Sequence, residues 1–118
     1  MDNDARLYVK TVLDLYLALP ETPTRVSRFD RSLALQLFQR AVPRSTIDTA
    51  FLLASARRLC RPPDAPSLGP IRSLHYFLPV IEEIIHHPLP DGYVQYLRHK
   101  LATWRLPKPS TTNPRPQV

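Results

Sequence analysis

Residues 44–60, RSTIDTAFLLASARRLC, carry apolar side chains on more than one face of a helix. Ile47 and Phe51 are four residues apart, which is the spacing of neighbours along one side of an α-helix. Leu52 and Leu53 widen this apolar arc well beyond the stripe that a surface helix needs. A helix of this kind needs neighbours on several sides. The sequence therefore predicts that residues 44–60 form a central helix.

Amphipathic helices are predicted before and after this segment. Apolar residues recur at three- and four-residue steps over residues 4–19 and again over residues 31–42. Asp30 precedes the second of these helices, and we expect its carboxylate to accept a hydrogen bond from the first turn. A further helix is predicted over residues 92–104, behind Asp91. The predicted apolar face of that helix consists of Tyr93, Tyr96, Leu97, Leu101 and Trp104.

A fourth helix is predicted from about residue 70 to residue 87, with a bend at Pro79. A proline inside a helix removes one hydrogen bond and costs about 3 kcal/mol or more. Either a kink, or a break that lets Pro79 begin a second helix, would relieve this cost. Glu82 and Glu83 are predicted to form a solvated face of this helix, because adjacent helical side chains diverge.

Proline also concentrates in two segments without helical periodicity. Residues 61–70 contain four Pro and one Gly, and they predict a linker-like loop. Residues 106–118 contain four Pro, two bases and no acid, and they predict a disordered basic Pro-rich tail. No strand pattern competes with the helices. The predicted fold class is all-α, a compact bundle of about five helices in a single domain spanning residues 1–105.

Length and composition predict how the chain is stabilised and in which compartment it works. The chain has 118 residues, which is enough to bury a core without disulfides or metal. Cys60 is the single cysteine, and no signal segment opens the sequence, so we expect a cytoplasmic protein. No apolar run is long enough to span a membrane, so no membrane partner is expected.

The sequence predicts no catalytic, metal or cofactor site. His75, His86 and His87 lie near two glutamates, but the spacing of zinc ligands on a helix is missing. Two histidines at the end of a helix also suit the negative end of its dipole. With only two glycines, the chain has no phosphate-binding loop and no nucleophile elbow. We therefore expect a protein that is not an enzyme.

The basic charge is concentrated in two blocks. Residues 25–61 carry eight Arg against two Asp, and residues 98–118 carry five bases and no acid. Thirteen of the sixteen bases are Arg, whose planar side chain suits phosphate. An anionic polymer is therefore a natural partner. The alternative is compositional, since a GC-rich genome also produces chains rich in Arg, Ala and Pro.

Residues 33–51, LALQLFQRAVPRSTIDTAF, resemble a helix-turn-helix with a resolvase-type recognition helix. The resemblance implies that the start of the second helix faces the major groove, with residues Arg44, Ser45, Thr46, Asp48 and Thr49. It also implies that Arg57 and Arg58 contact the phosphate backbone.

A broader similarity covers residues 28–104. The order of features is similar to the C-terminal helical domain of DnaD-like replication proteins and of related plasmid and phage replication initiators. That family has a Tyr-x3-Ile-x3-Trp motif after a Ser-Leu pair. Tyr76 and Val80 fit the motif behind Ser73-Leu74, but Ile84 stands at the Trp position. Tyr96 and Trp104 fit it a second time, with Lys100 at the Ile position.

In that family the region after the motif binds DNA. The resemblance therefore implies phosphate contacts from residues Arg98, His99, Lys100, Arg105 and Lys108. The expected function is a DNA-binding accessory protein of a bacterial replication or mobile-element system, which works beside protein partners. The alternative is a helical interaction adaptor that does not bind nucleic acid. Leu15 and Leu17 lie off the main apolar face of residues 4–19. A contact between two copies of the chain through this helix is therefore a further hypothesis.

Overall fold

The computed structural model describes residues 3–105, and the side chains of residues 3–102. Within this range the chain forms five α-helices and one short 3₁₀ helix, without strands, so the all-α prediction is confirmed. The predicted tail, residues 106–118, lies outside the described residues. In chain order the elements are α1 (Asn3–Leu17), α2 (Arg28–Gln39), α3 (Arg44–Leu59), η1 (Leu74–Phe77), α4 (Leu78–His86) and α5 (Asp91–Arg105).

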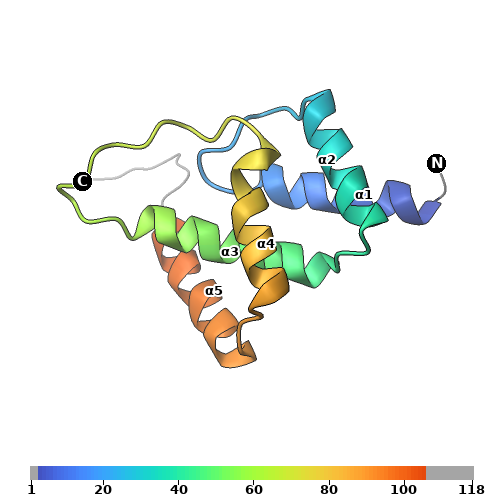
Figure 1. The fold of residues 1–118 in the computed structure, drawn as a ribbon. Coiled ribbons are helices and arrows are strands. Elements are labelled where there is room, and N and C mark those ends of the chain that lie inside the picture. Colours follow the sequence, from blue (N-terminus) through green and yellow to red (C-terminus); the bar gives the residue numbers. More distant parts are fainter. Residues whose placement is uncertain (1–2, 106–118) are drawn as a thin grey trace, which may run out of the picture.

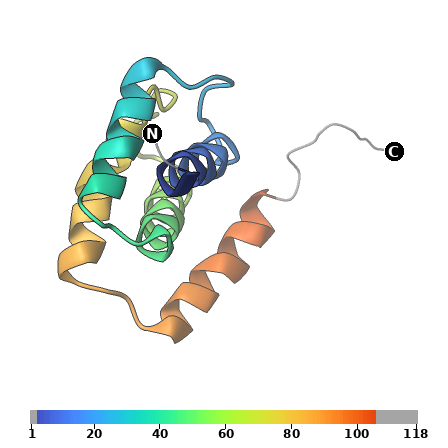
Figure 2. The same ribbon diagram turned by 90° about the vertical axis from the view of Figure 1, so that its right-hand side faces the viewer.

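Helix α3 is the centre of the bundle, as its apolar arc predicted. It lies between α4 on one side and α5 on the other, and α1 and η1 also pack against it (Figures 1 and 2). Six consecutive residues, 51–56, are all buried, which only a helix with neighbours on several sides permits. Helix α2 packs instead on α1 and η1.

The start of α2 differs from the prediction. Ser27 caps the helix: its Oγ accepts from the backbone N–H of Asp30 (3.1 Å), and Asp30 Oδ2 accepts from the Ser27 N–H (2.9 Å). Asp30 is therefore the third residue of a capping box and not the cap itself. Its second oxygen, Oδ1, accepts from the N–H of Leu74 (2.9 Å), and Asp30 is only 1% exposed.

Pro79 lies directly after the junction of two helical segments. Residues 70–73 are not helical, so the predicted start near residue 70 is wrong. The 3₁₀ turn η1 runs to Phe77, and α4 begins at Leu78 with Pro79 in its first turn. The missing N–H of a proline costs nothing there, because that N–H would have no partner within the helix. The helical path thus changes from 3₁₀ to α directly before Pro79, with no non-helical residue between the two segments.

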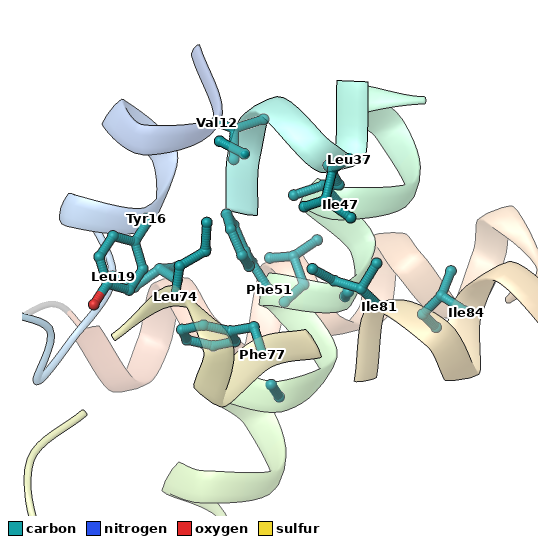
Figure 3. Close-up of a cluster of buried hydrophobic side chains, with 14 of the residues drawn as sticks. Val12, Tyr16, Leu19, Leu37, Ile47, Phe51, Leu74, Phe77, Ile81 and Ile84 are labelled. Carbon is teal, nitrogen blue, oxygen red and sulfur yellow. The ribbon is translucent and has the colours of Figure 1, made fainter. Parts of the chain in front are cut away.

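Aromatic side chains join η1 to the centre of the bundle. The ring of Phe77 meets that of Phe51 edge-on, with centroids 4.9 Å apart, and that of Tyr16 at 6.0 Å. Figure 3 shows the three rings in the buried cluster. Each of the three residues is at most 1% exposed. The core therefore connects α1, α3 and η1 directly, and Ile81 and Ile84 extend it along α4.

The buried face of α5 is narrower than predicted. Leu97 and Leu101 are buried and Val94 is half-buried. Tyr93 and Tyr96, assigned to the same face by periodicity, are 44% and 51% exposed. Among the described elements α5 packs mainly on α3, so only a strip two or three residues wide is covered. Trp104 lies beyond the described side chains.

Candidate nucleic-acid interface

Two of the arginines predicted to bind phosphate form ion pairs within the bundle. Both terminal nitrogens of Arg57 donate to the carboxylate of Glu83, at 2.8 and 2.6 Å. Arg98 Nη2 donates to Asp48 Oδ2 at 2.5 Å, which links α5 to the first turns of α3. A phosphate would have to compete with a carboxylate that is already in place at each of these arginines.

Arg58 is held more tightly than either. Its Nε donates to Glu21 Oε1 (2.7 Å), and it also donates to the carbonyl of Gly69. Its guanidinium lies over the ring of Tyr76, 5.5 Å from the centroid. Only 7% of the Arg58 side chain is exposed. These contacts tie the two connecting segments to α3, so Arg58 has a structural role.

Glu82 and Glu83 do more than the prediction of a solvated face implied. Their side chains are 38% and 40% exposed, and each also accepts two hydrogen bonds from an arginine on a different element. Glu83 binds Arg57 on α3, and Glu82 binds Arg40 at the end of α2, at 2.7 and 2.9 Å. The pKa of each carboxyl is lowered, first by the hydrogen bonds from its arginine. Adjacent helical side chains diverge, and here the divergence lets α4 clamp α2 and α3 together.

Arg44 is exposed at the first turn of α3, and no ion pair is found for it among the described residues. Of the other residues assigned to the major groove, Ser45 is exposed, whereas Thr46, Asp48 and Thr49 are half-buried. Beyond its first turn α3 is covered by α1, α4 and α5. A helix covered in this way cannot lie in a DNA groove, so a contact with a duplex at α3 is restricted to its N-terminal end.

The outer surface of α5 combines aromatic and basic side chains. The rings of Tyr93 and Tyr96 are stacked, with centroids 5.8 Å apart and planes 25° apart. Lys100 Nζ lies 5.8 Å from the Tyr96 centroid, and His99 is exposed beside it. Tyr93, Tyr96 and Lys100 follow one another at steps of three and four residues, so they form a continuous strip along one side of α5.

A hollow of about 380 Å³ opens beside this strip, between α3 and α5. Its walls include Tyr93, Tyr96 and Lys100 from α5, and Arg57 and Cys60 from α3 and its end. Periodicity assigned both tyrosines to the core, so the sequence did not predict this hollow. We call Tyr93, Tyr96 and Lys100 the α5 strip.

Two predicted phosphate contacts cannot be placed. The backbone of Arg105 ends α5, but its side chain is not among those described, and Lys108 lies beyond residue 105. In the replication-type motif, Tyr76 is exposed and Val80 half-buried, and Ile84 at the Trp position is buried in the core.

Other kinds of site find no support in residues 3–105. No three His, Cys, Asp or Glu side chains in that range come together in a way that could hold a metal ion. None of the helices in that range is both long and apolar enough to cross a bilayer.

Comparison with known proteins found no family model that matches the chain, no matching curated protein and no matching solved structure. The resemblance to DnaD-like domains therefore stays a prediction.

Proposed function

We propose that this chain is a non-enzymatic, cytoplasmic DNA-binding accessory protein of a bacterial replication or mobile-element system, and that it contacts unpaired bases through the α5 strip. The observation that supports this proposal is the exposure of Tyr93 and Tyr96 next to Lys100. Binding of single strands commonly combines aromatic faces, on which bases stack, with cations that contact the backbone.

The ion pairs support a narrower assignment of the contact. Arg57, Arg58 and Arg98 are engaged with carboxylates, so we assign them supporting roles. We assign the first phosphate contact to Lys100 because it lies beside the Tyr96 ring. Arg44 is the first residue of α3, whereas the α3 residues that border the hollow beside the strip begin at Leu53. We therefore assign Arg44 to a second contact. A single strand is favoured over a duplex because α3 is covered and a duplex hides its base faces.

The proposal is tested by fluorescence anisotropy with a labelled single strand of about 15 nucleotides and the matching duplex. We expect tighter binding of the single strand, and an affinity that falls steeply as salt rises from about 50 to about 200 mM. Binding that does not change with salt, or that favours the duplex, would contradict the proposal.

Variants of the α5 strip locate the contact. Tyr96→Ala should weaken binding about tenfold, because stacking on one base contributes about 1–3 kcal/mol, whereas Tyr96→Phe should retain it. Lys100→Gln should reduce the slope of log affinity against log salt by about 0.7, the value for one phosphate of a single strand. The matched controls are Phe29→Ala, which removes another exposed aromatic ring, and Arg25→Gln, which removes an exposed charge elsewhere. An equal effect of the controls would place the contact outside the strip.

A second candidate function is the interaction adaptor without nucleic-acid binding. It is favoured by a separate hollow between α1 and α2, whose walls suit a protein segment better than a nucleic acid. The two candidates use different surfaces, so the variants above distinguish them.

A further inference from the structure

A hollow with a volume of about 770 Å³ lies between α1 and α2. Its floor is apolar. Leu17, Val26 and Leu35 are half-buried there and pack against the core. Val9 and Leu13, which are buried, complete the floor from α1. We call this hollow the α1–α2 groove.

The rim of the groove is basic. Arg6 and Lys10 are one helical turn apart on α1, and Arg28 and Arg31 are nearly one turn apart on α2. Asp14 is the one acid among the lining residues, and its carboxylate binds Lys10 Nζ at 2.7 Å. No ion pair is found for the three arginines in the part of the chain that the structure describes.

We propose that the α1–α2 groove binds an acidic amphipathic helix of a partner protein. From Arg6 to Leu17 the groove follows α1 for about 17 Å, which corresponds to roughly three turns of a bound helix. An apolar stripe on that helix would cover the half-buried floor, and acidic side chains on its flanks would meet Arg6, Arg28 and Arg31. Both interactions are those of helix-in-groove recognition.

Other occupants fit less well. A nucleic acid would match the rim but would leave the apolar floor exposed to water. The chain's own residues 106–118 carry two bases and no acid, so their charge is the wrong sign. A symmetric contact between two copies would bring the basic rims together, because an isologous interface pairs each patch with itself.

The basic charge of the rim also predicts that the binding surface of the partner is acidic. The sequence balance of residues 1–24 is acidic, with four acids against Arg6 and Lys10, which alone would favour a basic partner. The fold places both of those bases at the groove, beside two arginines from α2. Of the acids described in this segment, only Asp14 lines the groove, where it pairs with Lys10, whereas Asp4 and Glu21 do not line it.

The test uses the full chain and a labelled model peptide of about 18 residues, long enough to form a helix. The peptide consists of Leu at three- and four-residue spacing, Glu and Ala. One control peptide has Lys in place of Glu, and another has the same composition with the leucines scattered around the helix. We expect the acidic amphipathic peptide to bind at least tenfold more tightly than either control.

The protein variant is Arg28→Glu combined with Arg31→Glu. Both changes place acids in the first turns of α2, where the helix dipole favours them, so the fold is maintained and circular dichroism should be unchanged. We expect at least a tenfold loss of affinity for the acidic peptide. The matched control, Arg72→Glu, reverses an exposed charge that does not line the groove and should leave the affinity unchanged.

Hydrogen exchange provides a readout of position. The bound peptide should slow exchange in α1 and α2 and leave α5 unaffected. The proposal is overturned by equal binding of the scattered or Lys peptide, by unchanged affinity of the double variant, or by protection at α5. Displacement of the peptide by single-stranded DNA would assign the groove to nucleic acid and would overturn the proposal as well. Failure of the α5-strip variants to affect DNA binding would leave this test unaffected.

Discussion

The carboxylate of Asp30 on α2 accepts a hydrogen bond from the backbone N–H of Leu74, forty-four residues further along the chain, at 2.9 Å. The other oxygen of the same carboxylate accepts a hydrogen bond from the backbone N–H of Ser27, the residue that caps α2. One buried side chain thus satisfies donors from two segments and fixes where η1 begins relative to α2. No hydrogen bond within η1 could satisfy the Leu74 N–H, because it is the first of that helix.

Replacement of Asp30 by Asn should therefore destabilise the fold by about 1–3 kcal/mol. The amide has a single acceptor oxygen, so its NH₂ group would face one of the two backbone donors. Urea unfolding measures the change. Asp64→Asn, at an exposed carboxylate in the segment after α3, should change the midpoint little. A midpoint that is the same for both variants would show that the buried contact contributes nothing.

Tyr16→Phe is expected to leave the stability unchanged or to raise it slightly. Tyr16 is 0% exposed, and its hydroxyl has no hydrogen-bond partner in the described part of the chain. Removal of a buried polar group without a partner costs no hydrogen bond, and the ring remains to pack against Phe77. Tyr8→Phe is the matched control. It removes a 2.6 Å hydrogen bond to the carbonyl of Val42 and should cost about 0.5–1.5 kcal/mol. Equal melting temperatures of the two variants would contradict this expectation.

The same two tyrosines predict a loss of stability in alkali. Burial raises the pKa of Tyr8 to about 12 and that of Tyr16 to about 12, from a usual value of 10.0. The folded state therefore favours the neutral form of each phenol. The contribution of the two neutral phenols to the free energy of unfolding is complete below pH 10 and is lost as the pH rises from there toward 12. Urea midpoints measured across this range should fall, and they should fall less in the Tyr8→Phe variant. A slope that is identical in the variant would show that Tyr8 does not cause the loss.

In acid, the clamp formed by α4 should weaken. The hydrogen bonds from Arg40 and Arg57 lower the pKa of Glu82 and Glu83 below the usual 4.5. The contribution of a lowered carboxyl is present above its usual pKa and is lost as the pH falls through the lowered value. The Glu82→Gln, Glu83→Gln double variant should therefore lose less stability than the wild type as the pH falls below 4.5. Both carboxylates are near the surface, so added salt should reduce the difference. If acid destabilises both proteins to the same extent at low salt, the clamp is not responsible.

A substitution of Arg58 tests whether this residue stabilises the fold or contacts DNA. Arg58→Gln should destabilise the protein by about 1–3 kcal/mol, because it removes the hydrogen bonds from the largely buried Arg58 side chain to Glu21 and to the Gly69 carbonyl. Arg25→Gln, at an exposed position in the connection before α2, should change the stability little. Once binding is normalised to the folded fraction, DNA affinity should be the same for the two variants. A larger loss of affinity in Arg58→Gln would give Arg58 a direct contact.

Local sequence determined most of the helices. The three- and four-residue apolar steps predicted all five, and the wide apolar arc of residues 44–60 predicted that α3 is central, because both features depend on side chains along a single helix. The role of Asp30 at the start of α2 was predicted only in part. The nearby Ser27 competes for the cap position, and the Leu74 N–H belongs to a segment that the local pattern cannot place.

Only the tertiary structure decided which charges and aromatic rings remain available. The partners of Arg57, Arg58 and Arg98 lie 26, 37 and 50 residues away, so no local pattern could pair them. Tyr93 and Tyr96 have the spacing of a core face, and they are exposed because α3, the main neighbour of α5 among the described elements, does not cover that side. The α1–α2 groove exists because two helices bring their basic residues to the same opening. Periodicity records which side of one helix is apolar, whereas exposure and charge pairing depend on how many other elements cover that side.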